Sequence, residues 1–278
     1  MEIIKVTGEA EQFKDQKLYQ SLLKSGASRE IADRIKTQVE DEVKAGMTTD
    51  QIFQKVFRYL KKEDICAAAR YRLKRGIMEL GPAGFLFEQY FSAILQEYGY
   101  GTRLNQMVRG ECVTHEIDIV ADKDTSRYFV EAKYHNSHGV KTDTKTVMYA
   151  YARLLDIIPA EQRRGYSTPI EYYGMWLVTN TKFTNRAKRY ARCRGITITG
   201  WGYPKKNSLQ YLIEEKLLHP ITVIPSVDRF SRERFAENKI LFAKDLVGYD
   251  ADRLVYAFGL LPSKARQIAR EVKALLKN

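Results

Sequence analysis

The chain has 278 residues, 44% of them hydrophobic and 29% charged, and its formal net charge is +12. This composition is typical of a folded globular protein and excludes a disordered, collagen-like or fibrous chain. No apolar run reaches about 18 residues and no signal-peptide pattern opens the chain, so we expect a cytoplasmic protein that does not contact a membrane.

The first 82 residues are predicted to form a small, mostly helical domain. A short apolar strand precedes a turn at Gly8, and helical spacing then continues to Gly26. Further helices are expected over 28–43, from 48 or 49 to 60, and over 63–80. Gly81, Pro82 and Gly84 break this pattern, which predicts a domain boundary between residues 82 and 83.

Residues 83–213 are predicted to form an α/β domain with a mixed sheet, because helical and strand patterns alternate along them. The expected elements are an aromatic helix (85–98), two strands (113–121 and 128–134), a helix (145–158), a strand (174–179), a basic helix (184–194) and a strand (196–199). The remainder, 214–278, is predicted to be a helical tail, with Gly259 and Pro262 between its last two helices.

Two neighbouring strands of this α/β domain carry a pattern typical of metal-dependent hydrolysis. Asp118 lies on the first strand, and Glu131 and Lys133 lie two residues apart on the second, so Glu131 and Lys133 share a face. The polar turn 122–126 can bring Asp118 and Glu131 together. Two converging carboxylates suit Mg²⁺ or Mn²⁺, and a nearby lysine can orient a water and offset charge on a phosphate. The alternative is an exposed strand face with a cross-strand charge pair.

Four segments repeat a pattern known from one enzyme family: GFLFE at 84–88, EIDIVA at 116–121, VEAKYH at 130–135 and LVTNTKFT at 177–184. Over about residues 83–213 the chain resembles the PD-(D/E)XK nucleases, specifically the Mrr-like restriction endonuclease domain. The resemblance implies that Asp118 and Glu131 bind the metal, that Lys133 acts on the attacking water, and that Glu88 completes the site. Glu131 stands where many Mrr-like members have Gln, which leaves the subgroup and the substrate preference open.

Three segments of the first domain carry a second resemblance: VTGEAEQF at 6–13, GMTTDQI at 46–52 and ARYRLK at 69–74. They are similar to an ATP-cone, a nucleotide-sensing module, over about residues 1–82. Amides at the Gly8 turn together with Lys5 and Lys17 could hold phosphates, and Arg70 or Lys74 could supply further charge. A helical domain that mediates self-association is the alternative.

Basic residues beyond the acidic pair point to a nucleic acid. Residues 83–213 contain 18 basic and 12 acidic residues, a net charge of +6. One predicted helix has no acid and carries five cations that could follow a phosphate backbone: Arg186, Lys188, Arg189, Arg192 and Arg194. A solvated helix face is the alternative. The segment FGLLPSKA at 258–265 is similar to a helix-hairpin-helix, which grips a phosphate, although a plain helical hairpin would look the same.

Taken together, these features predict a Mg²⁺-dependent DNA endonuclease that is regulated by ATP or dATP and acts in defence against foreign DNA. We expect a homodimer or a higher homo-oligomer, because cutting both strands generally requires two sites. Two other functions remain open: a nucleotide-responsive DNA-binding regulator with a non-cleaving nuclease fold, and a nuclease of DNA repair or Holliday junctions.

Overall fold

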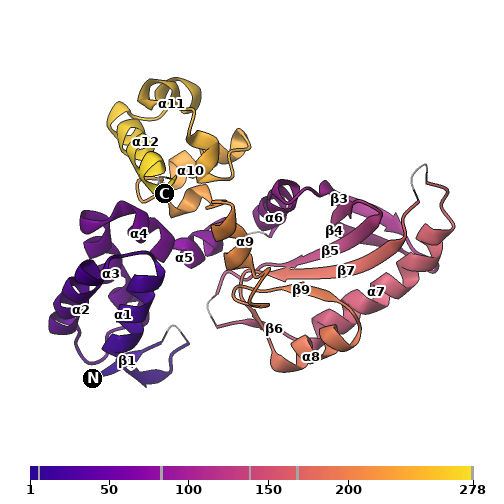
Figure 1. Ribbon diagram of the computed structural model, residues 1–278, viewed down its shortest axis with the longest axis horizontal. Coiled ribbons are helices and arrows are strands. Elements are labelled where there is room, and N and C mark those ends of the chain that lie inside the picture. The colour runs from indigo at the N-terminus through magenta and orange to yellow at the C-terminus, as the bar shows by residue number, and fades with distance from the viewer. Residues whose placement is uncertain (6, 82–83, 138, 167–168, 277–278) are drawn as a thin grey trace. The chain divides into compact units, whose positions relative to one another are not determined.

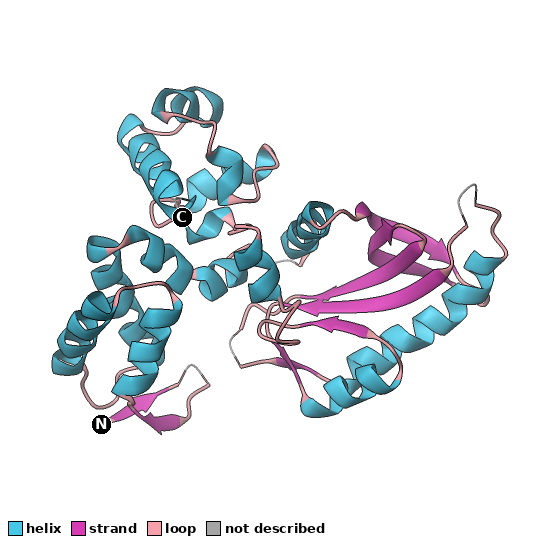
Figure 2. Cartoon of the chain, in the orientation of Figure 1, coloured by secondary structure: helices cyan, strands magenta, loops and turns pink. Residues whose placement is uncertain are grey.

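The computed structural model describes residues 1–5, 7–81, 84–137, 139–166 and 169–276. Backbone contacts divide the chain into two compact units. The split unit consists of Met1–Ile77 and His219–Asn278, and the sheet unit consists of Met78–Leu218. Each is described by itself (Figures 1 and 2). The boundary predicted between residues 82 and 83 lies outside the described residues.

The first segment of the split unit is a small hairpin followed by helices. Strands β1 (Glu2–Ile4) and β2 (Ala10–Gln12) pair antiparallel, and Gly8 between them has a φ of 84°, which favours glycine. The helices are α1 (Asp15–Lys24), α2 (Arg29–Glu42), α3 (Thr49–Glu63), α4 (Ile65–Tyr71) and α5 (Leu73–Met78). Ser28 caps α2, and Thr48 forms a capping box with Gln51 at the start of α3.

One helix prediction in this segment was wrong. The continuous helix expected over 63–80 is two helices, α4 and α5, separated at Arg72, the C-cap of α4. Asp64 caps the start of α4 by accepting a hydrogen bond from the Ala67 amide. Gly76 on α5 is packed so closely that an added Cβ would lie 2.8 Å from Cγ1 of Val223. The split of the helix therefore places α5 against the second segment of the same unit.

The second segment of the split unit is helical, as predicted. Its elements are η1 (Ile221–Val223), α10 (Arg229–Glu237), η2 (Ala243–Leu246), α11 (Ala251–Phe258) and α12 (Pro262–Leu276). The Thr222 hydroxyl donates to the Gly76 carbonyl at 2.7 Å, and the Cys66 thiol of α4 donates to the Ala274 carbonyl of α12 at 2.5 Å. These bonds join the two segments, which are far apart in sequence.

The sheet unit has the mixed α/β architecture that the sequence predicts. Its elements are α6 (Phe85–Glu97), β3 (Gly101–Arg109), β4 (Thr114–Lys123), β5 (Ser126–Lys133), β6 (Lys141–Thr142), α7 (Thr144–Gln162), β7 (Tyr172–Thr179), β8 (Lys182–Phe183), α8 (Asn185–Cys193), β9 (Thr197–Thr199) and α9 (Leu209–Glu215). The main sheet has the order β3-β4-β5-β7-β9. Strands β3, β4 and β5 are antiparallel, and β7 and β9 continue the sheet in parallel with β5.

Helices cover both faces of this sheet. Figure 1 shows α6 on one side and α7 with α8 on the other. Phe129 and Leu177 pack with α7 and α8, because strand alternation turns them to that face. Their neighbours Val130 and Trp176 turn to the other face, where Phe91 of α6 lies edge-on to Trp176 at 5.7 Å. No helix in the described part of the chain is long and apolar enough to cross a membrane.

Several elements of the sheet unit differ from the prediction. The two-residue strands β6 and β8 and the short helix α9 were not expected, and two longer elements, β3 and α7, also differ. Strand β3 was missed because it is an edge strand in which almost every second residue is exposed, so it lacks an apolar run. Helix α7 was expected to end at residue 158, before Pro159, yet it continues to Gln162. Proline inside a helix costs about 3 kcal/mol. The last turn of α7 is held by Glu161, whose buried carboxylate accepts a hydrogen bond from Arg127 of β5 at 2.8 Å.

Candidate active site

The hairpin formed by β4 and β5 places the two predicted metal ligands next to each other. The strands pair antiparallel, with Ile119 opposite Val130. Asp118 and Glu131 are the next residues on each strand, so their side chains emerge on one face. Oδ2 of Asp118 accepts a hydrogen bond from the Ala132 amide at 2.7 Å, which fixes this carboxylate beside β5.

Two cations hold Glu131. Nζ of Lys133 lies 2.6 Å from Oε1 of Glu131, and the Arg153 guanidinium binds Oε2. The side chains of Glu131 and Arg153 are each 8% exposed, whereas that of Lys133 is 40% exposed. Lys133 can therefore meet a ligand from solvent, while Arg153 acts from within the protein.

The pKa values of Asp118 and Glu88 are raised at this site. Burial, and then the Glu131 carboxylate, raises the pKa of Asp118 from 3.8 to about 6. Burial also raises the pKa of Glu88, with the charges of Asp118 and Glu131 as further causes. Glu88 lies in the first turn of α6 beside Gly84, where an added Cβ would be 3.4 Å from Oε1. The structure thus gathers all four predicted catalytic residues in one electrostatic environment.

Arg153 was missed by the sequence reasoning. It lies on α7 between Ala150 and Leu154, on the buried stripe of that helix, and Nη2 donates to the Glu116 carbonyl of β4. An arginine on the apolar stripe of a predicted helix could have indicated a buried ion pair, because a buried charge requires a partner. The identity of that partner, Glu131, becomes evident only from the packing of α7 on the sheet.

Asn180 is a second residue that the sequence reasoning did not assign. Its buried side chain accepts a hydrogen bond from the His135 amide at 2.9 Å and donates to the His135 carbonyl at 2.7 Å. The ring of His135 lies 3.2 Å from the Thr142 hydroxyl. These bonds fix the backbone that follows Lys133, and so help to hold the lysine at the site.

The residues present suit a divalent cation bound through few protein ligands. Among the described residues, no three His, Cys, Asp or Glu side chains gather closely enough to form a metal cage. Mg²⁺ commonly uses one or two carboxylates and completes its shell with waters and substrate phosphates. Asp118 and Glu131 supply such a pair. Burial, and then the Glu131 charge, raises the pKa of Asp118, and a bound cation would favour its charged form.

The five predicted DNA-binding cations all lie on α8 or at its C-cap. Arg186 and Arg189 are exposed, whereas Nζ of Lys188 lies 4.4 Å from the centroid of the Tyr203 ring. The Arg192 guanidinium is 3.4 Å from the Tyr203 hydroxyl, and that of Arg194 lies over the Tyr151 ring. Lys188 and Arg194 thus pack on aromatic rings, and Arg192 bonds a tyrosine hydroxyl. All five except Lys188 are exposed and so can meet an anion from solvent.

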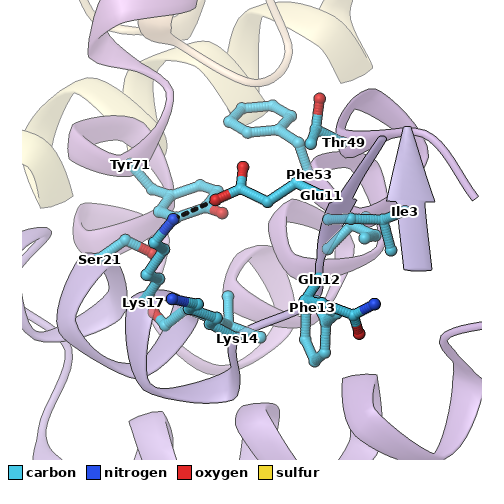
Figure 3. Close-up of a pocket in the computed structure, with 12 residues that line it drawn as sticks. Ile3, Glu11, Gln12, Phe13, Lys14, Lys17, Ser21, Thr49, Phe53 and Tyr71 are labelled. Carbon is cyan, nitrogen blue, oxygen red and sulfur yellow. Dashed lines mark hydrogen bonds and ion pairs between the residues drawn. The ribbon is translucent and has the colours of Figure 1, made fainter. Parts of the chain in front are cut away.

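The split unit contains a cavity of about 260 Å³ between its hairpin and helices α1, α3 and α4 (Figure 3). Of the five predicted nucleotide-binding residues, Lys17 is the one that lines it in the described part of the chain, and it forms an ion pair with Glu11. The rings of Phe53 and Tyr71, which sequence reasoning did not assign, line the cavity and stack at 5.0 Å.

The other four predicted nucleotide-binding residues lie away from the lining of this cavity. Nζ of Lys5 lies 3.3 Å from Glu9 and 3.4 Å from Glu11, so its charge is already paired. The remaining three lie at the hairpin turn, on α4 and on α5: Gly8, Arg70 and Lys74.

Comparisons with known proteins match the sheet unit to one family. A family model described as restriction endonuclease matches residues 83–200, which include all four predicted catalytic residues. An uncharacterized protein of Archaeoglobus fulgidus is 39% identical over 183 residues, covering 66% of this chain and 98% of that protein. The crystal structure of a protein of unknown function, AF1548, has 36% sequence identity and a TM-score of 0.55, and the match covers 69% of this chain and 97% of that one.

Proposed function

The chain belongs to the restriction endonuclease family through residues 83–200, and from this premise we propose that it is a metal-dependent endonuclease that hydrolyses phosphodiester bonds in DNA. The observation that carries the proposal is the grouping of Asp118, Glu131 and Lys133 at the end of the β4–β5 hairpin. The two carboxylates offer oxygen ligands, and the half-exposed lysine offers a cation to the substrate.

In the proposed reaction, each residue has a defined task. Asp118 and Glu131 would hold the cation, Mg²⁺ or Mn²⁺, which when bound supplies Lewis-acid stabilisation of charge on the phosphate. Lys133 would donate a hydrogen bond to the attacking water and offset the negative charge that develops on the phosphate oxygens. As the water oxygen bonds to phosphorus, the bond to the leaving oxygen breaks. Arg153 and Asn180 would position Glu131 and Lys133 without touching the substrate.

Replacing Lys133 by alanine tests this assignment. We expect Lys133→Ala to abolish plasmid cleavage in Mg²⁺ while leaving the melting temperature near that of the wild type, because the side chain is 40% exposed. Lys62→Ala, which removes an exposed lysine from the last turn of α3 in the split unit, is the matched control and should cut normally. Cleavage by Lys133→Ala at the wild-type rate would contradict the assignment. A wild type that binds DNA in Mg²⁺ but never cuts it would favour the DNA-binding regulator instead.

We also propose that residues 1–82 act as an ATP-cone that binds ATP or dATP and sets nuclease rate or oligomeric state. The cavity lined by Lys17, Phe53 and Tyr71 supports this, because a cation can meet phosphates and aromatic rings can stack on a base. A nucleotide would have to replace Glu11 as the partner of Lys17. Lys17→Ala should weaken ATP binding in calorimetry, whereas Lys24→Ala, at the exposed end of α1, should not. Equal affinities in both variants would remove Lys17 from the proposed site.

The wider setting remains a proposal. We propose that residues 1–82 form the sensor, 83–213 the nuclease and 214–278 a helical tail. We also propose that a homodimer or higher oligomer cuts the DNA. The proposed location is the cytoplasm, and the proposed role is defence against foreign DNA. The role in defence is suggested by the family, which consists of restriction endonucleases. Light scattering with and without ATP, followed by cleavage of methylated and unmethylated plasmid, tests the assembly and the substrate separately.

A further inference from the structure

A second cavity lies in the sheet unit, on the face opposite the carboxylates. Its volume is about 310 Å³, and its lining includes the rings of Tyr98, Tyr100, Tyr128 and Trp176. Tyr128 and Glu131 are three positions apart on β5, so strand alternation turns them to opposite faces. We name this cavity the aromatic pocket. It is separate from the site built around Asp118 and Glu131, and neither the family model nor the relatives assign it a role.

The rings of the aromatic pocket hold one another in place. The Trp176 centroid is 5.8 Å from that of Tyr100 and 5.6 Å from that of Tyr128, and both pairs meet edge to face. Nε1 of Trp176 donates to the Thr199 hydroxyl at 3.0 Å, which fixes the indole. At Gly174, an added Cβ would lie 3.0 Å from the Tyr128 ring, so the glycine lets that ring lie close over the strand. The pocket therefore has preformed aromatic walls.

The polar groups of the pocket indicate the charge of its ligand. Lys123 is the single charged side chain among the described residues that line it, and no acidic residue is present there. Nζ of Lys123 donates to the Tyr98 carbonyl at 2.9 Å and lies 5.1 Å from the Tyr100 centroid, which holds the cation beside the rings. Aromatic rings can also bind an ammonium group, but here the Lys123 cation would repel such a ligand. Thr197 and Asn207 add groups that can hydrogen-bond the edge of a planar ligand.

We propose that the aromatic pocket binds the base of a nucleotide, with the phosphate group of that nucleotide near Lys123. Aromatic walls stack on a base, threonine and asparagine reach its edge, and a lysine meets the anion, which together match a nucleotide better than an apolar or cationic ligand. The nucleotide is either free or an unpaired residue of a nucleic acid strand. The second source rests on the proposed function, because it requires DNA to be the substrate.

The test measures Trp176 fluorescence in EDTA, where no metal-dependent cleavage occurs, with Trp201 replaced by phenylalanine so that one tryptophan remains. The titrants are dAMP, a twelve-nucleotide single strand, the same strand with abasic sites, and deoxyribose 5-phosphate. We expect quenching by dAMP, by the intact strand or by both, and little by the base-free ligands. Quenching by dAMP identifies a free-nucleotide site, and quenching by the intact strand alone identifies an unpaired residue of DNA.

Matched tyrosine variants assign the binding to the pocket. Tyr128→Leu should raise the dissociation constant about tenfold, the loss typical of one base-stacking contact. Tyr172→Leu is the control, because Tyr172 lies 5.6 Å from Tyr128 but is 44% exposed and outside the lining. Tyr100→Leu decides the matter if Tyr128→Leu fails to fold.

Three outcomes would overturn the proposal: no quenching by any nucleotide, equal quenching by base-free ligands, or equal affinity in the wall variants and Tyr172→Leu. The assay contains no metal and so does not depend on cleavage. If no nucleotide quenched the fluorescence of a wild type that cuts DNA, only the proposal for the aromatic pocket would be refuted. A wild type that never cuts would instead count against the proposed function.

Discussion

Replacing Asp118 by asparagine should make the metal-free protein more stable. The pKa of Asp118 is raised from 3.8 to about 6 by burial and by Glu131. A carboxyl with a folded-state pKa above its unfolded value contributes stability below about pH 4 and loses it as the pH rises through about 6. At pH 7.5 the charged group is therefore a cost, and asparagine removes the charge while keeping an acceptor for the Ala132 amide.

The gain in stability expected for Asp118→Asn follows from the pKa shift of Asp118. Two pKa units correspond to about 3 kcal/mol, and partial exposure of Asp118 to solvent reduces this to roughly 2 kcal/mol. For a unit of this size, that raises the melting temperature by roughly 5 °C. The assay is thermal unfolding in EDTA at pH 7.5 and pH 4.5, where Asp118→Asn should gain stability at the higher pH and little at the lower.

A control with the opposite sign is available at Asp156. This carboxylate accepts a hydrogen bond from the Cys112 amide at 2.8 Å and lies 2.8 Å from the His115 ring, and these contacts help to lower its pKa to about 2. A lowered pKa contributes stability above about pH 4, so Asp156→Asn should melt earlier at pH 7.5. If Asp118→Asn melted at or below the wild-type temperature in EDTA at pH 7.5, the argument that burial and the Glu131 charge penalise the Asp118 carboxylate would be refuted.

Two further predictions concern the cations. Arg153→Met should destabilise the metal-free protein by roughly 3 kcal/mol in urea denaturation, because it breaks a buried ion pair. Arg163→Met, which breaks an exposed pair at the C-cap of the same helix, should change little, and equal losses would contradict this. Replacing Arg186 and Arg189 together by alanine should reduce the slope of log K for DNA binding against log salt by about 2, one unit per phosphate contact, with Arg29→Ala of the split unit as control. An unchanged slope would remove α8 from the DNA interface.

The site residues that could be predicted from the sequence are those that lie close together along the chain. Asp118, Glu131 and Lys133 lie on one hairpin, where strand alternation and a short turn are enough to place them together. Arg153 lies 22 residues beyond Glu131 on a helix, and its partner depends on how that helix packs on the sheet. Asn180 is placed by a parallel strand after a long crossover, a contact that local patterns cannot reach.

The helices and strands, too, were predicted where their signals are local and missed where they depend on tertiary contacts. Helices with strong apolar stripes and polar caps, such as α2 and α3, were predicted because their signals are local. Strand β3 was missed because an exposed edge strand carries little apolar pattern, and α7 was cut short because the tertiary bond from Arg127 to Glu161 outweighs the local preference of Pro159. The joining of two distant segments in the split unit has no local signal at all.

That split unit has a consequence for how the protein is made. Its first segment, Met1–Ile77, leaves the ribosome before the sheet unit, but its partner His219–Asn278 follows only after Met78–Leu218 has been synthesised. At 5–20 residues per second, synthesis of the sheet unit separates the two halves by roughly 7 to 28 s. Bonds such as that from Thr222 to Gly76 can therefore form only after the sheet unit has been synthesised. A prematurely terminated chain would keep the four proposed catalytic residues but would lack the second segment of the split unit, against which the first segment packs.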